Sequence, residues 1–247
     1  MKKNESGFTL VELAIVLMII GLLIGGVLRG QEMMRNAQLQ KIITQITSYQ
    51  GAIHTFMDSY QSYPGDLPTA TSRVPGCTTA NACRNGNGNG LIGTPVLLFH
   101  GGQEGIETEN SQFWKQLSMA HLITGVNPSA ATPDWGISHP AAPVPGGFTL
   151  ITALQSNDTA AEYGSMHTGA IVIRLHGFLT GSIDGGPVLS SSQAGYIDRK
   201  MDDGIPGTGD VLSKAAGQAS QQAQECEVAY TGRTDLAFCV MHFVVQR

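Results

Sequence analysis

The stretch that decides the fold is Gly7-Phe8-Thr9-Leu10-Val11-Glu12-Leu13, and apolar residues follow it as far as Leu28. A helix over residues 8–28 is about 31 Å long at a rise of ~1.5 Å per residue. This length is close to the hydrocarbon thickness of a bilayer. The stretch is therefore predicted to cross a membrane as one helix, with the rest of the chain attached to it.

Two features distinguish this stretch from a secretory signal peptide or an ordinary membrane anchor. Glu12 lies inside the apolar run, where a charged side chain costs roughly 2.5–3.5 kcal/mol on insertion scales. Its carboxylate is therefore expected to need a partner. In addition, no small-residue cleavage site follows the run, as secretory processing would require; the small residue Gly7 comes before it.

The charges of the first six residues predict the orientation. Lys2 and Lys3 stand against Glu5, and positively charged flanks tend to stay on the cytoplasmic side of a membrane. The bulk of the chain is then expected to face outward.

The segment resembles the class III signal of type IV pilins and type II secretion pseudopilins, which has a glycine, an aromatic residue, a glutamate four residues further on and then an apolar run. The resemblance implies that a prepilin peptidase cleaves between Gly7 and Phe8 and that the new Phe8 amine is N-methylated. It also implies that Glu12 pairs with the Phe8 amine of a neighbouring subunit. Glu12 would then fix the register, because subunits in a wrong register leave a buried charge unpaired. The alternative is a plain single-span anchor with an isolated glutamate.

The helix is predicted to continue beyond the membrane, because apolar residues recur at three- and four-residue steps on one face. These residues are Ile42, Ile43, Ile46, Tyr49, Ile53, Phe56, Met57 and Tyr60. No proline precedes Pro64 in the sequence, so one helix from about residue 9 to about residue 60 is predicted, ~75 Å long. The charged residues just beyond the membrane either pair between subunits or form a solvated surface. They are Arg29, Glu32, Arg35 and Lys41.

The remaining elements predict an α+β fold. Turn chemistry at residues 63–68 ends the long helix, a loop runs to about residue 94, and residues 111–123 form a short helix. Strands are expected at residues 148–154, 170–178 and 236–246. A long helix packed on a C-terminal antiparallel sheet with long loops is also the pilin architecture that the resemblance implies.

The chain is thus divided into four parts. They are a leader (1–7), a membrane-spanning and filament-core helix (8–30), an amphipathic continuation of that helix (31–62) and an exported globular domain (63–247).

Composition argues against a nucleic-acid partner. The net charge is −5, and the basic residues are scattered along the chain, whereas a nucleic-acid binder usually presents a basic patch. Only 13% of the residues are charged and glycine numbers 31, which suits an exported, loop-rich domain.

The four cysteines lie outside the membrane segment, in a compartment that permits disulfides. Three connectivities are possible. Pairing of Cys77 with Cys83 and of Cys226 with Cys239 is favoured, because each pair is close in sequence and brackets a plausible loop or hairpin. A zinc site is the rival, but neither pair has C-x-x-C spacing.

Two segments are candidates for a structural calcium ion, and no other cofactor is predicted. In the first, Asn85, Asn87 and Asn89 alternate with glycines like the first half of an EF-hand loop. All three are neutral amides, however, and Val96 stands where a bidentate glutamate is needed. A simple turn region is the alternative.

The second calcium candidate is the acidic segment at residues 198–210. Residues 190–203 are predicted to form a helix that leaves Asp202 and Asp203 at its C-terminus, where the helix dipole disfavours anions. A cation shared with Asp198 and Asp210 would compensate for them. The alternatives are backbone amides of the glycine turns or the neighbouring basic side chains.

Catalytic motifs are absent from the sequence. The histidines form no H-E-x-x-H or H-x-H pattern, and there is no G-x-S-x-G elbow or phosphate-binding loop. A non-enzymatic role is therefore predicted.

The function implied by the resemblance is that of a structural subunit, major or minor, of a type IV pilus-like filament. Its partners would be copies of itself or other pilins, the prepilin peptidase/methylase and the bacterial inner membrane. The C-terminal domain would face the periplasm before the subunit joins a periplasmic or extracellular filament. The alternatives are a pseudopilin of a type II secretion system and a minor pilin that acts as an adhesion or binding module.

Overall fold

The structure is a computed structural model of the whole chain. It describes residues 9–92, 109–130, 134–152, 170–179, 182–215 and 239–246, together with residues 226, 229, 230 and 237.

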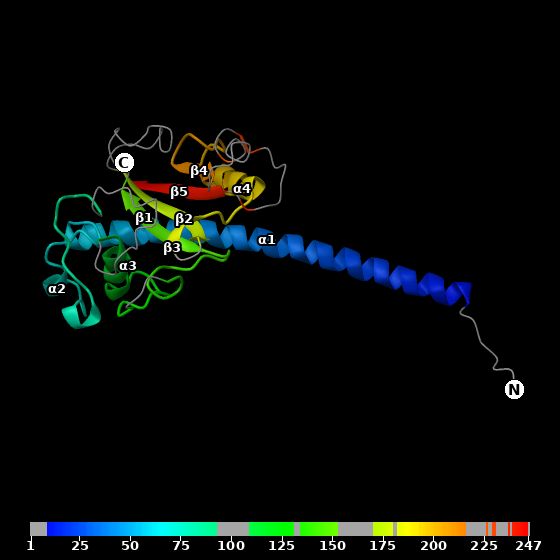
Figure 1. Cartoon of the computed structure of the whole chain (residues 1–247), viewed down its shortest axis with the longest axis horizontal. Helices are drawn as coiled ribbons and strands as arrows, with labels where there is room; N and C mark the ends of the chain where they lie inside the picture. The colour runs from blue at the N-terminus through cyan, green and yellow to red at the C-terminus, as the bar shows by residue number, and fades with distance from the viewer. Residues whose placement is uncertain are drawn as a thin grey trace.

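A single helix, α1, covers Leu10–Tyr60 and dominates the shape of the molecule (Figure 1). It starts with a capping box, in which Thr9 and Glu12 satisfy each other's backbone amides. It ends where Gln61 takes a left-handed conformation, with φ 56°, three residues before Pro64. The continuous helix predicted from the sequence is confirmed.

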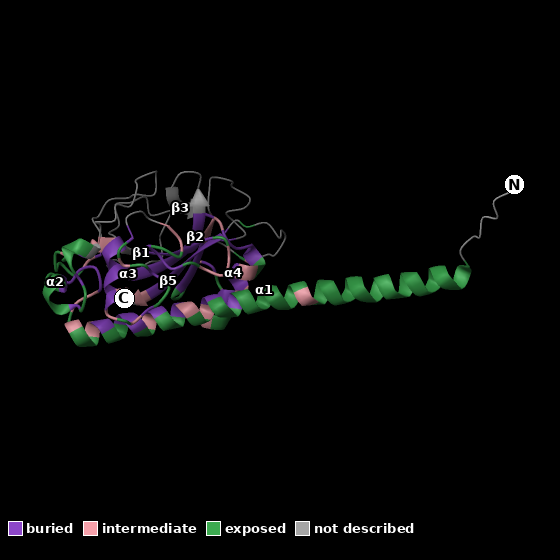
Figure 2. Cartoon of the chain, turned by 90° about the horizontal axis from the view of Figure 1, so that it is seen from below, coloured by how far each residue is buried: buried purple, intermediate pink, exposed green. Residues whose placement is uncertain are grey.

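The two halves of α1 have different surroundings (Figure 2). From Leu10 to Leu28 the large apolar side chains are exposed, whereas one face is buried from Leu39 onward. The buried residues of this face are Leu39, Ile42, Ile46, Tyr49, Ala52, Ile53 and Phe56. The apolar steps that predicted packing in the second half therefore coincide with the observed contact face.

The C-terminal domain contains an antiparallel sheet in the order β1-β2-β5-β4, with β3 paired to β2. The strands are β1 (Gly147–Thr152), β2 (Ile171–Leu179), β3 (Ser182–Gly186), β4 (Val211–Ala215) and β5 (Cys239–Gln246). The predicted segments match β1, β2 and β5. The strands β3 and β4 were not predicted, since each is five residues long and lacks a run of β-branched or aromatic residues.

The sheet packs on α1 through aromatic side chains. Tyr49 of α1 makes edge contacts with Trp114 and with Phe148 of β1, with ring centroids 5.3 and 5.4 Å apart. Trp114 belongs to α3 (Glu109–Met119). The helix α4 (Ser191–Met201) lies at the end of the domain from which the N-terminal half of α1 projects (Figure 1). Burial of such rings supplies much of the free energy that holds the domain on the helix.

The helix α3 also buries a polar face, which the sequence pattern did not predict. Gln112, Lys115 and Gln116 are at most 1% exposed. Gln112 Nε2 and Lys115 Nζ donate to the Ala82 carbonyl, and Gln116 Nε2 donates to the Arg84 carbonyl. These side chains donate the hydrogen bonds that a neighbouring strand would otherwise supply to the carbonyls of Ala82 and Arg84. They thereby hold the irregular segment after residue 77 in place. The stretch between α1 and about residue 94, which was expected to be loop, contains two short elements, α2 (Ala70–Arg73) and a 3-10 helix (Thr79–Asn81).

Candidate functional site

The predicted cleavage site lies outside the described residues. Gly7 and Phe8 belong to residues 1–8, which the structure does not describe. The described part of the chain starts at Thr9. Cleavage and methylation therefore stay predictions.

Glu12 lies in the first turn of α1 and has a partner in its own chain. Its Oε2 accepts hydrogen bonds of 2.9 Å from both the backbone nitrogen and the hydroxyl of Thr9, and Thr9 Oγ1 accepts from the Glu12 nitrogen at 3.3 Å. These contacts hold the carboxylate toward the N-terminal end of the helix. The sequence already carried this signal, because Thr-x-x-Glu before an apolar run is a capping-box pattern.

The membrane-spanning prediction agrees with the exposed half of α1. Within the described residues, α1 is long and apolar enough to cross a membrane. A Cβ atom at Gly21, Gly25 or Gly26 would meet nothing within 4 Å. Because glycine has no side chain, these positions are depressions on the exposed surface of the helix.

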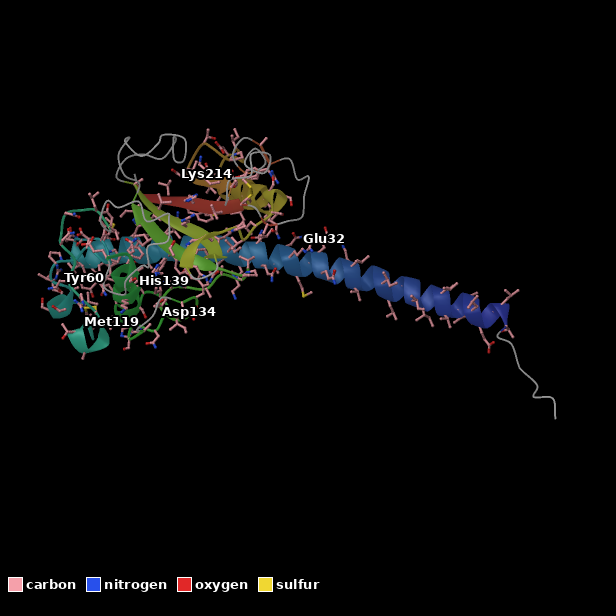
Figure 3. The ribbon with its side chains drawn as sticks, in the orientation of Figure 1. Glu32, Tyr60, Met119, Asp134, His139 and Lys214 are labelled. Atoms are coloured by element: carbon pink, nitrogen blue, oxygen red, sulfur yellow. A yellow bond between two sulfur atoms is a disulfide. The ribbon has the colours of Figure 1, made fainter. Side chains whose placement is uncertain are left out.

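The charged residues beyond the apolar half are arranged along one exposed segment of the helix. Arg29 Nη1 and Glu32 Oε2 are 2.9 Å apart, and their side chains are 75% and 61% exposed. Figure 3 places Glu32 where α1 leaves the domain, at the end opposite Tyr60. Arg29 and Glu32 pair within the subunit, while Arg35 and Lys41 are exposed. Such an exposed pair contributes little stability.

Both disulfides have the pairing that the sequence favoured. Cys77 is bonded to Cys83 and Cys226 to Cys239. All four residues are at most 1% exposed. The second disulfide ties the segment that carries Tyr230 to the first residue of β5.

The first calcium candidate surrounds a carboxylate instead of a cation site. The backbone nitrogens of Gly88 and Asn89 donate to Asp66 Oδ1 at 2.7 and 3.1 Å, and that of Gly90 donates to Asp66 Oδ2 at 2.8 Å. Asp66 is 2% exposed. Successive N–H groups that converge on an anion form an anion-binding concavity, which here is filled by the protein itself.

The asparagine oxygens in this segment accept local hydrogen bonds. Asn85 Oδ1 accepts from the backbone nitrogen and hydroxyl of Thr71, Asn87 Oδ1 from the Asn89 nitrogen and Asn89 Oδ1 from the Leu91 nitrogen. Asn87 and Asn89 thus each stabilise the turn around them, and Asn85 ties the segment to Thr71 of α2. This geometry favours the turn alternative over an EF-hand-like loop.

The second calcium candidate brings three carboxylates together at the C-terminal end of α4. Asp198, Asp202 and Asp203 each offer an oxygen within 4.8 Å of the others. Asp202 is the C-cap residue, and its Oδ2 accepts from the nitrogens of Asp210 and Val211. The predicted helix end is therefore confirmed to within two residues, and Asp202 lies just outside the helix.

Chain donors also occupy the other two carboxylates. Asp203 accepts from the Ile205 nitrogen and the Thr208 hydroxyl, and Asp198 accepts from the Gly204 nitrogen.

Tyr230 also donates to Asp198, through a hydroxyl 2.8 Å from Oδ2. Burial and the adjacent Asp198 carboxylate raise the pKa of Tyr230. The phenol therefore keeps its proton and its donor role at neutral pH.

These donors decide how well a cation fits the acidic loop. Calcium takes six to eight oxygen ligands, whereas the cluster supplies three carboxylates that already accept N–H and O–H groups. The residues fit a self-contained loop better than a calcium centre. The observed donors to Asp202 and Asp203 are backbone amides of the loop that follows α4, together with the Thr208 hydroxyl.

A cluster of one arginine and two histidines lies on the face of the sheet opposite to α1. Arg174 and His176 alternate along β2 with core residues, and His242 of β5 lies opposite Arg174 in the register. His176 Nε2 is 2.8 Å from Thr149 Oγ1. Burial, and secondarily the Arg174 charge, lowers the pKa of His176 to about 3, and the same two causes lower the pKa of His242. Both rings are therefore neutral structural groups at physiological pH.

Three residues with clear roles were missed at the level of sequence. Thr9 was readable from the capping-box pattern. Asp66 and Tyr230 carried no local signal, since their partners lie 22 and 32 positions away in the chain.

Comparison with known proteins identifies the N-terminal segment. Residues 2–28 match the prokaryotic N-terminal methylation motif, the signature of the prepilin-type signal of type IV pilins and pseudopilins. No curated protein and no solved structure matches the chain. The match covers the segment that contains Gly7, Phe8 and Glu12, and it supports a pilin-like or pseudopilin precursor. The long helix followed by an antiparallel sheet is an α+β, pilin-like architecture.

Proposed function

We propose that this protein is a structural subunit of a type IV pilus-like filament, made as a precursor that is cleaved after Gly7 and methylated at Phe8. The apolar half of α1 holds the precursor in the inner membrane with the domain on the periplasmic side. In the filament the same half packs against the helices of other subunits. The observation that carries the proposal is the prepilin-type motif on a helix whose apolar half is left uncovered by the rest of the chain.

The mechanism follows from the two environments of this half-helix. In a bilayer the apolar side chains are solvated by lipid, but the Glu12 carboxylate is costly there. In a bundle of subunits the Phe8 amine of a neighbour offsets that charge, and shallow places at glycines allow helices to approach closely. Assembly then gains from both packing and charge pairing.

Partners follow from the same contacts. They are other copies of the chain or related pilins, a prepilin peptidase/methylase that acts at the Gly7–Phe8 bond, and the inner membrane. Major and minor subunits share these contacts, as do pseudopilins. A strain that lacks the protein should therefore be tested both for loss of surface filaments and for loss of secretion of periplasmic enzymes.

The experiment is a comparison of Glu12→Leu with Glu12→Gln. Glutamine can keep the capping box with Thr9 but has no charge, so it separates helix capping from charge pairing. We expect both variants to insert and to be cleaved, and both to lose most sheared filaments. Cleavage is measured by gel mobility, and Phe8 methylation by mass spectrometry of the new N-terminus.

Each part of the proposal has its own contradicting result. Wild-type filament yield from Glu12→Gln would contradict the charge-pairing role. An uncleaved wild-type chain in cells with an active prepilin peptidase would contradict the precursor assignment.

A further inference from the structure

The segment that wraps around Asp66 contains three consecutive Asn-Gly steps, Asn85-Gly86, Asn87-Gly88 and Asn89-Gly90. Such steps are open to deamidation, because glycine has no side chain to hinder ring closure. In this reaction the glycine nitrogen loses its proton and attacks Cγ of the asparagine, and the side-chain nitrogen leaves as ammonia. Water then opens the succinimide ring and leaves aspartate or isoaspartate.

The attacking nitrogens of the second and third steps are held by one carboxylate. The Gly88 nitrogen donates to Asp66 Oδ1 at 2.7 Å and to the Asp66 carbonyl at 3.0 Å. The Gly90 nitrogen donates to Asp66 Oδ2 at 2.8 Å. A nearby negative charge disfavours loss of a proton from these groups, because it would bring two anions together.

The electrophilic side chains are held as well. Asn87 Oδ1 accepts from the Asn89 nitrogen at 2.9 Å, and Asn89 Oδ1 accepts from the Leu91 nitrogen at 2.8 Å. Each side-chain carbonyl is thereby bonded to the nitrogen two residues on. Ring closure requires the nitrogen one residue on, so the folded segment restrains both reacting groups.

We infer that Asn87-Gly88 and Asn89-Gly90 are latent deamidation sites that the Asp66 carboxylate keeps closed while the domain is folded. Reaction then proceeds only through local opening of the segment. A segment that has reacted does not close again as before. A new carboxylate at position 87 or 89 is repelled by Asp66, and an isoaspartate lengthens the backbone.

The first step provides an internal comparison within the same segment. The Gly86 nitrogen donates to the Leu67 carbonyl at 2.9 Å. A Cβ atom on Gly86 would lie 2.3 Å from the Asp66 carbonyl carbon, so this glycine is packed against backbone. Asn85 is therefore restrained independently of the Asp66 charge.

The test compares deamidation rates of the purified full chain in detergent, in warm, mildly alkaline buffer, by peptide mapping with mass spectrometry. The folded wild type is compared with the wild type unfolded in urea with its disulfides intact. We expect Asn87 and Asn89 to react about ten- to hundredfold more slowly in the folded chain, as expected when one charge-assisted hydrogen bond must open. Equal rates in the folded and unfolded chains would overturn the inference.

The role of Asp66 is tested with Asp66→Asn against Asp58→Asn, which makes the same charge change at an exposed position of α1. We expect faster reaction at residues 87 and 89 in folded Asp66→Asn, unchanged Asn85, and wild-type rates in the control. Where Asp66→Asn does not fold, Asp66→Glu moves the charge by one methylene and is expected to raise the same two rates. Unchanged rates in the folded Asp66 variant would contradict the assignment.

Discussion

Glu12 illustrates how one residue serves two purposes. In the subunit it completes a capping box with Thr9, and in the proposed filament it meets an amine from a neighbour. The first role explains why a carboxylate is tolerated at the start of an apolar helix: it satisfies amides that the helix itself cannot pair.

His176 is one residue through which acid should destabilise the domain. Its pKa is lowered to about 3 by burial, whereas an unfolded histidine titrates near 6.5. Between these values the unfolded chain binds a proton that the folded chain refuses. Stability is therefore present above about pH 6.5 and falls as the pH drops toward 3, by at most about 1.4 kcal/mol per pH unit for this group.

The measurement is the free energy of unfolding of the domain by urea at neutral pH and near pH 5. We expect His176→Gln to reduce the loss between the two values, and His54→Gln, at an exposed site on α1, to leave it unchanged. His242 contributes in the same direction, so part of the slope should persist in His176→Gln. A slope identical to that of the wild type would show that His176 does not titrate in this way.

At the scale of elements, the loop between α4 and β4 shows why acidic residues can follow a helix C-terminus. Asp202 turns its carboxylate onto the nitrogens at the start of β4. The Ser213 nitrogen donates to the Pro206 carbonyl, so the same loop covers part of the edge of β4. Covering an edge strand reduces unwanted pairing with other chains.

Gly209 should be essential to this loop. It has φ +78°, and a Cβ atom there would lie 1.9 Å from Asp202 Oδ2. We expect Gly209→Ala to destabilise the domain by roughly 2–4 kcal/mol, from backbone strain together with loss of the Asp202 bonds. Gly125→Ala is the matched control, since Gly125 has φ +82° with nothing within 4 Å of a Cβ atom.

Thermal or urea unfolding of the two glycine variants measures the difference. The control should lose only the cost of backbone strain, on the order of 1 kcal/mol. Equal losses in both variants would mean that the contact with Asp202 contributes nothing.

At the scale of the whole molecule, α1 is the support on which separate parts of the domain meet. Tyr49 contacts both α3 and β1, and Gln40 Nε2 donates to Tyr196 of α4 at 2.5 Å. The domain is thus fixed to the second half of α1 at several points. Its first half is left free for a membrane or for other subunits (Figure 2).

The Cys226–Cys239 disulfide should contribute more than the Cys77–Cys83 disulfide, because it closes 13 positions of chain instead of six. Replacing both residues of the longer loop by serine is expected to cost about 3 kcal/mol in the chain-entropy model, and the shorter loop somewhat less. Urea unfolding of the two double variants measures this. A larger loss for the Cys77–Cys83 variant would contradict the loop-length argument.

Local patterns in the sequence predicted the features that depend on neighbouring residues. The apolar run without proline predicted the long helix, and the apolar residues at three- and four-residue steps predicted its buried face. The close spacing of the cysteines predicted the disulfide partners. Each of these features depends on residues that are near one another in the chain. The Gly-Phe-Thr-Leu-Val-Glu segment likewise specified the prepilin-type signal.

The partners of the buried polar groups, by contrast, became visible in the folded chain. Asp66 lies among glycine amides, Gln116 pairs with the backbone near Cys83, and Tyr230 reaches Asp198. The physical reason is that a buried polar group must find a partner wherever the fold places one, and such partners are set by contacts between distant segments. In both segments predicted as calcium candidates, carboxylate or amide oxygens accept hydrogen bonds from the chain's own backbone.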